Sequence, residues 1–143
     1  MDDAIARLIE PGASIAVAGA SRDEGKYGNR IFSFLLEHGY DAYPINPNAD
    51  EVAGRRCYAN IKDLPMVPTL VDMVVPPANA GGIIDDCIEA GVEAVWFQPG
   101  SEDESAMEKA RKAGLHVISG RCIMVEIAGQ GYWDAGMQKV QAA

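Results

Sequence analysis

The chain has 143 residues, of which 48% are hydrophobic, and it carries a formal net charge of −9 at pH 7. That length and apolar content suit one compact domain over residues 1–143 and are too small for two. The excess of negative charge makes nucleic acid and anionic membrane surfaces poor partners. No apolar run approaches the ~20 residues of a membrane span, so we expect no membrane association.

Cysteine usage favours a reducing compartment. Cys57, Cys87 and Cys122 lie far apart and form no CxxC pair, which argues against a disulfide scaffold or a zinc knuckle. Only His38 and His116 add further candidate ligands, so we expect no metal site. The N-terminus, MDDAIARLIEPG, lacks the basic flank and long apolar core of a secretion signal, and we expect a cytoplasmic location.

After a short N-terminal helix, the first predicted elements form a strand, a glycine turn and a helix. Residues 15–18 are an apolar run typical of a buried strand, and the run breaks at Gly19. An amphipathic helix then begins near Gly28 or Asn29. In a parallel sheet this arrangement presents backbone N–H groups and a helix N-terminus to an anion, usually a phosphate.

The rest of the chain continues the alternation of strands and helices. Further strands are predicted at residues 41–45, 70–75, 94–97 and 116–118, with a short one at 57–58 and a helical turn at 61–64. The helix after strand 70–75 carries Gly81 and Gly82 in its first turn. The next helix begins with Ser101 and Glu104 as a capping box, and the tail after residue 123 is weakly patterned. This alternation predicts an α/β fold, a doubly wound parallel sheet of about five strands.

Four strand ends form the candidate binding site. In doubly wound sheets ligands bind beyond the carboxyl ends of the strands, where the winding direction reverses. The chain positions that meet there are Gly19-Ala20-Ser21, Asn46-Pro47, Val75-Pro76-Pro77 and Gln98-Pro99-Gly100. Turns favour Gly, Pro and Asn in any protein, so the four ends together carry more weight than any one of them.

The first turn limits the choice of nucleotide. A dinucleotide fingerprint needs a second glycine and an acidic residue at the end of the second strand. Here Gly19-Ala20-Ser21 lacks that glycine, the second strand ends in Asn46, and the loop before the helix contains Lys26. Phosphate binding is therefore expected without ordinary NAD binding, and the absence of G-x-x-x-x-G-K-[ST] excludes a Walker A loop.

Six segments together resemble a known family. They are VAGAS at 17–21, LLEHGYDAYPINPN at 35–48, EVAGRRCYANIKDLP at 51–65, VDMVVPPA at 71–78, AGVEAVWFQPGSEDE at 90–104 and GLHVISGRCIMVE at 114–126. In this order they resemble the small CoA-binding-domain proteins, whose Rossmann-like fold is similar to the N-terminal domain of the succinyl-CoA synthetase α subunit. The resemblance spans nearly the whole chain.

The resemblance implies coenzyme A or an acyl-CoA bound along the strand ends. Gly19, Ala20 and Ser21 would bring backbone and hydroxyl donors to the diphosphate or 3′-phosphate, and Lys26 would supply positive charge. Asn46 and Pro47 would border the adenosine part. Val75, Pro76 and Pro77 would form an apolar wall, and Gln98 would lie near the pantetheine path.

No catalytic residue is expected. By the resemblance, the synthetase α subunit uses a phosphorylated histidine in a second domain, which this chain lacks, and His38 and His116 are interpreted as structural. Arg121 could lower the pKa of the neighbouring Cys122 thiol, but a nucleophilic cysteine also needs a base and an oriented partner. Cys122 is therefore interpreted as buried and inert, and the protein as a non-enzymatic binding module.

Two other functions stay open. The first is a nicotinamide-nucleotide binder, acting as a redox sensor or a minimal dehydrogenase. The second is an interaction protein whose nucleotide crevice is vestigial, with a protein partner that the sequence leaves undefined. Titration with CoA and with NADH separates the first from a CoA module, and thermal stabilisation by any nucleotide argues against the second.

Overall fold

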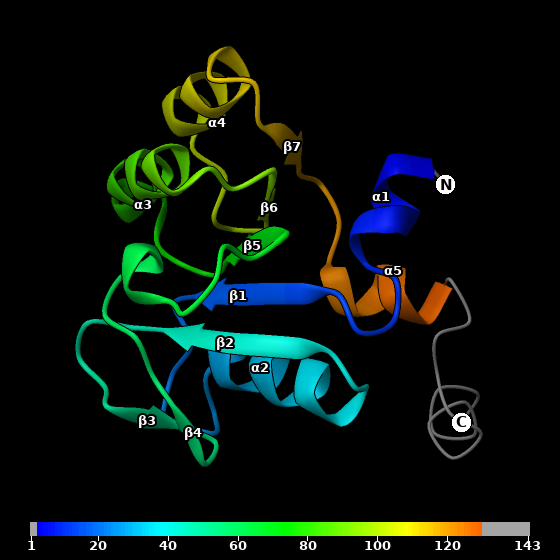
Figure 1. The fold of residues 1–143 in the computed structure, drawn as a ribbon, viewed down its shortest axis with the longest axis vertical. Coiled ribbons are helices and arrows are strands. Elements are labelled where there is room, and N and C mark those ends of the chain that lie inside the picture. The colour runs from blue at the N-terminus through cyan, green and yellow to red at the C-terminus, as the bar shows by residue number, and fades with distance from the viewer. Residues whose placement is uncertain (1–2, 130–143) are drawn as a thin grey trace.

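The computed structural model describes residues 3–129, which fold into a parallel sheet with helices on both faces (Figure 1). The sheet consists of β1 (Ser14–Ala18), β2 (Asp41–Ile45), β5 (Leu70–Met73), β6 (Ala94–Phe97) and β7 (His116–Ile118). Its spatial order is β2-β1-β5-β6-β7, and every neighbouring pair is parallel. A separate antiparallel ribbon pairs β3 (Glu51–Val52) with β4 (Arg55–Arg56).

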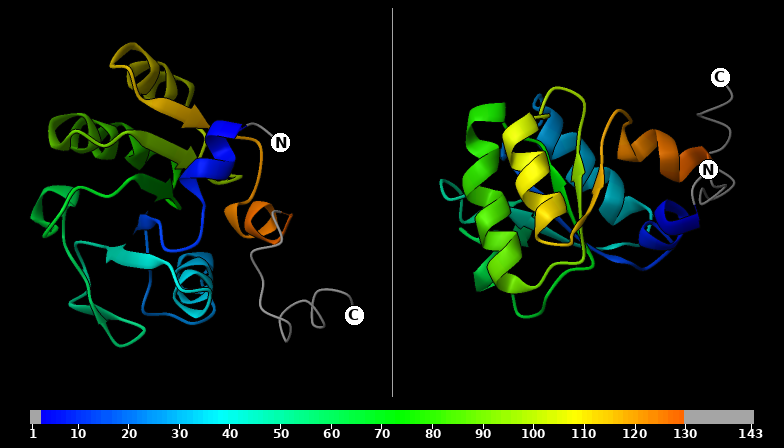
Figure 2. Two further views of the ribbon diagram at one scale, coloured as in Figure 1. Left: turned by 45° about the vertical axis from the view of Figure 1, so that its right-hand side comes forward. Right: turned by 90° about the horizontal axis from the view of Figure 1, so that it is seen from above.

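The helices form two layers, one on each face of the sheet (Figure 2). They are α1 (Asp3–Leu8), α2 (Tyr27–Glu37), α3 (Pro77–Ala90), α4 (Glu104–Lys112) and α5 (Ile123–Gly129), with a 3₁₀ turn η1 (Ile61–Asp63). Side chains of α1, α2 and α5 form one buried cluster with the sheet, and those of α3 and α4 form the other. Among the described residues, no helix combines the length and hydropathy needed to cross a membrane.

Strand alternation decides which side chains face each helical layer. Ile15 and Val17 pack toward α2, whereas Ala16 and Ala18 pack toward α3. All four side chains are fully buried. β1 is therefore covered on both faces, which explains why it reads as a continuous apolar run.

One isolated bridge completes the strand order. Tyr58 N donates to Pro44 O at 3.0 Å, and Asn46 N donates to Tyr58 O at 2.9 Å, so Tyr58 pairs in parallel with Ile45 outside β2. The strand predicted at 57–58 is thus reduced to one bridging residue. When this bridge is counted as a strand, the order becomes the Rossmann order 3-2-1-4-5-6. The predicted Rossmann-like, doubly wound sheet is confirmed.

Several predicted element ends are wrong. α2 begins at Tyr27, β5 ends at Met73, and α3 begins at Pro77, so its two glycines lie in the second helical turn. Pro77 suits the first position of a helix, where no N–H is needed. The segment after residue 122 forms α5, where no element was predicted, and the tail beyond 129 lies outside the described residues.

The predicted capping box before α4 is also wrong. Asp103 is the N-cap, in an extended conformation, and its side chain accepts a hydrogen bond from Ala106 N at 2.9 Å. Ser101 instead accepts from Val75 N at 3.1 Å, across to the connection that follows β5. A tertiary contact therefore takes the hydroxyl that the local pattern assigned to a helix end.

Candidate functional site

The turn after β1 is built by close backbone contact. Gly19 has φ +95°, and a Cβ there would overlap the carbonyl oxygen of Val74. A Cβ on Gly28 would overlap the carbonyl oxygen of Gly19. The end of β1, the segment after β5 and the first turn of α2 thus approach one another at two glycines. Gly28 allows α2 to pack closely against the end of β1, as the third glycine of a dinucleotide fingerprint does. Its spacing from Gly19 differs from the spacing in that fingerprint.

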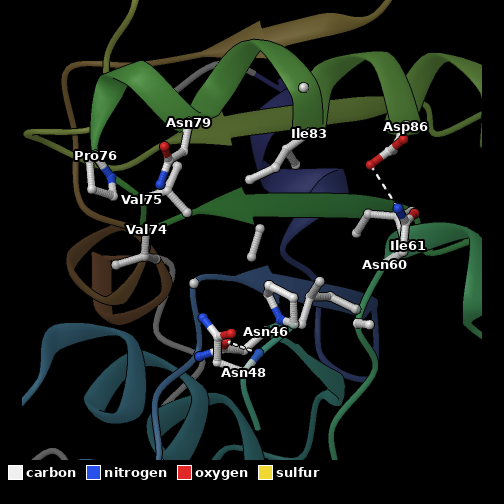
Figure 3. A pocket seen from close by; sticks show the side chains of 16 residues that line it. Asn46, Asn48, Asn60, Ile61, Val74, Val75, Pro76, Asn79, Ile83 and Asp86 are labelled. Carbon is white, nitrogen blue, oxygen red and sulfur yellow. Dashed lines mark hydrogen bonds between the residues drawn. The ribbon is translucent and has the colours of Figure 1, made fainter.

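A cavity of about 540 Å³ opens at this corner, on the side of α3 (Figure 3). We call it the switch-point cleft, because it lies where β1 and β5 send the chain in opposite directions along the sheet. It is lined by Ala18 and Gly19, residues 45–48, residues 59–61, residues 74–76, and Asn79, Gly82, Ile83 and Asp86 of α3.

The polar lining of the cleft is mostly amide. Asn46, Asn48, Asn60 and Asn79 line it, and Figure 3 shows Asn46 beside Asn48 and Asn60 facing Asp86. Asn60 Nδ2 donates to Asp86 Oδ2 at 2.9 Å, which joins the segment before η1 to α3. Amide side chains both donate and accept hydrogen bonds, so this lining suits the base, hydroxyl and amide groups of a ligand.

The side chain of Asn46 joins the loops after β1 and β2. Its Nδ2 donates to Ala20 O at 2.8 Å, and its Oδ1 accepts from Asn48 N at 2.8 Å. Both functional groups of the side chain are therefore used inside the protein. An aspartate at this position could make only the second of these bonds, because it has no N–H to donate.

The structure brings together only part of the predicted site. Gly19, Asn46, Pro47, Val75 and Pro76 line the cleft. The other predicted residues lie outside its lining: Ala20 is buried, Ser21 and the exposed Lys26 belong to the loop before α2, Pro77 is exposed at the start of α3, and Gln98 is buried. Ser21 Oγ accepts from Asp23 N at 3.0 Å, within its own loop. The ligand roles of all these residues stay predictions.

Some lining residues were missed by sequence reasoning. The cleft is also lined by Asn48, Asn60, Asn79 and Asp86, which the predicted site did not include. Asn60 directly precedes the predicted helical turn at 61–64, and Asp86 lies within the predicted helix after strand 70–75, so neither was assigned to the site. The run INPN gave a local signal for Asn48, which comes just after Asn46 and Pro47. Asn60 and Asp86 are 26 positions apart, and only the tertiary fold brings them together.

A second, shallow depression of about 490 Å³ lies next to the cleft. Tyr27, residues 74–76 and residues 99–101 line it, so the two cavities share residues 74–76. We call it the Tyr27 depression. Its lining is predominantly apolar in residue type, and it adjoins the start of α2.

Behind the Tyr27 depression lies what we call the thiol cluster: Tyr27, Asp72, Gln98 and Cys122. The Tyr27 hydroxyl is 3.0 Å from Cys122 Sγ, and Gln98 Nε2 donates to the same sulfur at 3.3 Å. Gln98 Oε1 accepts from Ile123 N at 2.9 Å, which fixes the orientation of the amide. The half-buried Cys122 sulfur thus has two side-chain donors directed at it.

These contacts shift two pKa values in opposite directions. Burial acts to raise the pKa of Cys122, but hydrogen bonds from Tyr27, from Gln98 and from the nearby backbone outweigh it, and the pKa lies below its ordinary value. Burial and the hydrogen bond to Cys122 raise the pKa of Tyr27 to about 12. The Tyr27 hydroxyl therefore stays protonated and serves as the hydrogen-bond donor to the sulfur.

Asp72 is the most unusual member of the cluster. Its side chain is fully buried, and neither carboxyl oxygen has a hydrogen-bond partner among the described residues. Burial, and secondarily the charge of Cys122, raise its pKa well above the usual 3.8. A carboxyl in this position is favoured as the neutral acid.

The interpretation of Cys122 as buried is wrong, whereas its inertness stays a prediction. The residue is half-buried, and its pKa is lowered by groups that the sequence did not connect with it. Arg121 is not the cause: its side chain lies 3.6 Å from Glu126, and its carbonyl oxygen accepts from Trp96 Nε1. Gln98 and Cys122 were considered from the sequence, whereas Asp72, an acidic residue inside the apolar run LVDMVV, was a signal of this cluster that the predictions did not use.

The fold and the cleft define a class. A Rossmann-like sheet with a glycine corner and a cleft at its switch point is the arrangement of nucleotide-binding α/β domains. The sequence profile of the CoA-binding domain family matches residues 13–128, and the chain belongs to that family.

Similar proteins fall into two groups: ligases of which this chain matches a minor part, and small proteins that it matches over nearly their whole length. The α subunit of an ADP-forming acetate–CoA ligase II from Pyrococcus furiosus is 32% identical over 76% of this chain and 26% of its own length. The chain spans only 17–26% of the first curated ligases that it matches. The uncharacterized protein YneT of Bacillus subtilis is 24% identical over 85% of this chain and 90% of its own length. A structure of a hypothetical protein from Pyrococcus horikoshii superposes with a TM-score of 0.86, at 36% identity over 90% of this chain and 91% of that one.

Proposed function

We propose that this protein binds coenzyme A or an acyl-CoA at the carboxyl ends of its strands, as a module without a catalytic role of its own. The observation that carries the proposal is the switch-point cleft beside Gly19 in a member of the CoA-binding domain family. CoA is the small-molecule partner, and the cytoplasm is the expected location of the protein.

The cleft chemistry supports the neutral parts of that ligand. Asn79 offers donors and acceptors to an adenine base, a ribose or a pantetheine amide. Asn46 and Asn60 each keep a second N–H and a second acceptor lone pair beside the bonds that they make within the protein. Val75 and Pro76 offer an apolar wall to the same groups. The phosphates belong nearer Gly19, where the loop through Ser21 and Lys26 supplies amides and a positive charge.

The ligase relatives support a division of labour. Their names describe whole enzymes, and this chain corresponds to a minor part of their length. We assign to the chain the binding of the CoA moiety and not the ligase reaction. The polar atoms of Gln98 contact Cys122 and Ile123. Gln98 would therefore act on the pantetheine arm of the ligand through these two residues.

The test uses two neighbouring glycines of α3. Gly82 lines the cleft with open space where a Cβ would stand, whereas Gly81 lies outside the lining, and a Cβ there would make only an ordinary contact with Lys109. Gly82→Leu should weaken CoA binding at least ~10-fold by filling the cleft, which corresponds to ~1.4 kcal/mol. Gly81→Leu is the matched control and should keep the parent affinity.

Isothermal titration calorimetry with CoA, acetyl-CoA and NADH measures these affinities. Tighter binding of NADH than of CoA would replace the proposal by the nicotinamide alternative. Equal CoA affinity in the parent and the Gly82→Leu variant would move the site out of the cleft. If none of the three nucleotides raises the melting temperature of the protein, the result favours the alternative of an interaction protein with a vestigial crevice.

A further inference from the structure

The thiol cluster is not used by reversible binding in the cleft. Tyr27 Oη at 3.0 Å and Gln98 Nε2 at 3.3 Å both meet the Cys122 sulfur, and the backbone N–H groups of Met124 and Val125 add to them. Donors that converge on one sulfur stabilise its thiolate form, which is the nucleophilic form of cysteine. A merely structural cysteine has no need of them.

Asp72 gives a second, independent sign that this place receives a polar group. Strand alternation directs its side chain to the α2 and α5 face, because its neighbours Val71 and Met73 pack on the other face. Asp72 is electrostatically coupled to Tyr27, and Cys122 to Asp72, so the carboxyl lies close to both side chains. A fully buried carboxyl with two unpartnered oxygens is costly even as the neutral acid, and a polar atom of a ligand would supply the missing hydrogen bonds.

Tyr27 connects the cluster to the nucleotide site. Its hydroxyl contacts Cys122, and its side chain lines the depression that shares residues 74–76 with the cleft. A ligand with its nucleotide end in the cleft and a long arm across residues 74–76 would bring the end of that arm to Tyr27. Coenzyme A has such an arm, and the arm ends in a thiol.

We infer that Cys122 is a covalent modification site that forms a mixed disulfide with the thiol end of a CoA-type ligand supplied as its disulfide. This inference rests on the proposed function, since the cleft must hold the nucleotide. The Cys122 thiolate attacks one sulfur of the ligand disulfide, and the ligand S–S bond breaks as the new S–S bond forms. The other half leaves as a thiolate that takes a proton from water, so Cys122 is oxidised and the departing half is reduced.

Tyr27 and Gln98 are positioning residues in this exchange. Both contact the Cys122 sulfur, and the Tyr27 hydroxyl donates to its thiolate. Burial favours the neutral acid form of Asp72, which places no negative charge beside that thiolate. The groups that face Cys122 from the surrounding elements are therefore Tyr27 of α2, Asp72 of β5 and Gln98 after β6.

The first experiment is intact-protein mass spectrometry of the freshly reduced protein after incubation with CoA disulfide. The parent should gain one CoA less two hydrogen atoms, and dithiothreitol should remove it. Cys122→Ser should gain nothing, whereas Cys57→Ser, which lacks a cysteine of the other sheet edge, should react like the parent. Bis(2-hydroxyethyl) disulfide, which has no nucleotide, should modify Cys122 at least ~10-fold more slowly, because binding holds the reacting groups together.

The outcomes separate this inference from the proposed function. If Cys122→Ser binds CoA by calorimetry and the parent gains no adduct, the inference is overturned and the binding function stands. If the parent does not bind CoA and both disulfides react at one rate, both proposals fall. An adduct mapped to Cys57 in the parent also overturns the assignment to Cys122.

Tyr27→Phe tests the positioning role. Loss of the hydroxyl removes a donor from the thiolate, so the pKa of Cys122 should rise and the pH profile of its alkylation by iodoacetamide should move to higher pH. An unchanged alkylation profile would show that the hydroxyl does not act on the thiol.

Discussion

The switch-point cleft lies on the α3 side of the strand ends and the thiol cluster on the α2 and α5 side, and the two regions differ in chemistry. The cleft, beside α3, is lined by asparagines, of which Asn46 bonds to the backbone and Asn60 to Asp86. The cluster, beside α2 and α5, contains three ionisable groups with raised or lowered pKa values. One sheet thus presents a surface suited to reversible recognition on one face and a surface suited to reaction on the other.

The glycine corner should respond most strongly to mutation, because both regions depend on it. Gly19→Ala adds a Cβ in the left-handed region, against the Val74 carbonyl, and should lower the free energy of unfolding by about 3–5 kcal/mol. Gly39→Ala, with φ +82° and open space around the Cβ, is the matched control and should lose only about 1–2 kcal/mol. Urea denaturation measures both.

Equal losses in the two glycine variants would mean that the corner tolerates a Cβ and that only backbone strain matters. A bulky residue at Gly19 is therefore unsuitable for testing ligand binding alone, since it disrupts the fold first.

Asp72 should make stability depend on pH in a direction opposite to that of a paired carboxylate. Its pKa is raised in the folded state, so the folded protein holds the proton more tightly than the unfolded chain. Stability should fall as pH rises above about 3.8, by up to ~1.4 kcal/mol per pH unit, until the folded pKa is passed. Asp72→Asn should lack this fall, and the two proteins should show the same slope below that window.

Urea denaturation from acid to neutral pH gives the comparison, because only the difference in slope between the parent and Asp72→Asn belongs to this side chain. Parallel curves of stability against pH would show that the Asp72 carboxyl is ionised and solvated in the folded protein. The difference in chemistry between the thiol cluster and the cleft would then be smaller.

Substitutions of Ser101 and Asp103 should distinguish a contact that shapes the cleft from a helix cap that does not. Their effects on stability should be smaller than those of the preceding variants. Ser101→Ala leaves Val75 N without its acceptor, and Asp103→Ala removes the α4 cap, so each should cost about 1 kcal/mol of stability. Only Ser101→Ala should also weaken CoA binding, because Val75 lines the cleft. Equal affinity in both variants would show that Ser101 does not shape the cleft.

Local patterns predicted the elements and failed where tertiary contacts decide. Apolar runs located every main strand, and glycine and proline located the turn after β1 and the one after β5. Ser101 and Asp103 both fit a helix cap, and only the position of Val75 determines which of them serves. The weakly patterned segment that became α5 is held by Ile123 and Ile127 in the core, not by a strong helical pattern of its own.

The cleft was predictable in part, and the thiol cluster almost not at all. Strand ends meet at one edge of a parallel sheet by topology, so Gly19 and Asn46 could be placed together before the fold was known. Tyr27 and Cys122 are 95 positions apart, and neither ends a predicted strand. Their contact depends on how α2 and α5 pack, which no spacing in the sequence encodes.

The two hydrogen bonds of the Asn46 side chain have a consequence for affinity. They fix the loops after β1 and β2 to each other before any ligand arrives. A preorganised rim loses little conformational entropy on association, so more of the contact energy is retained as affinity. Asn46→Ala should therefore show its main effect as a less favourable binding entropy, with the fold of the sheet retained.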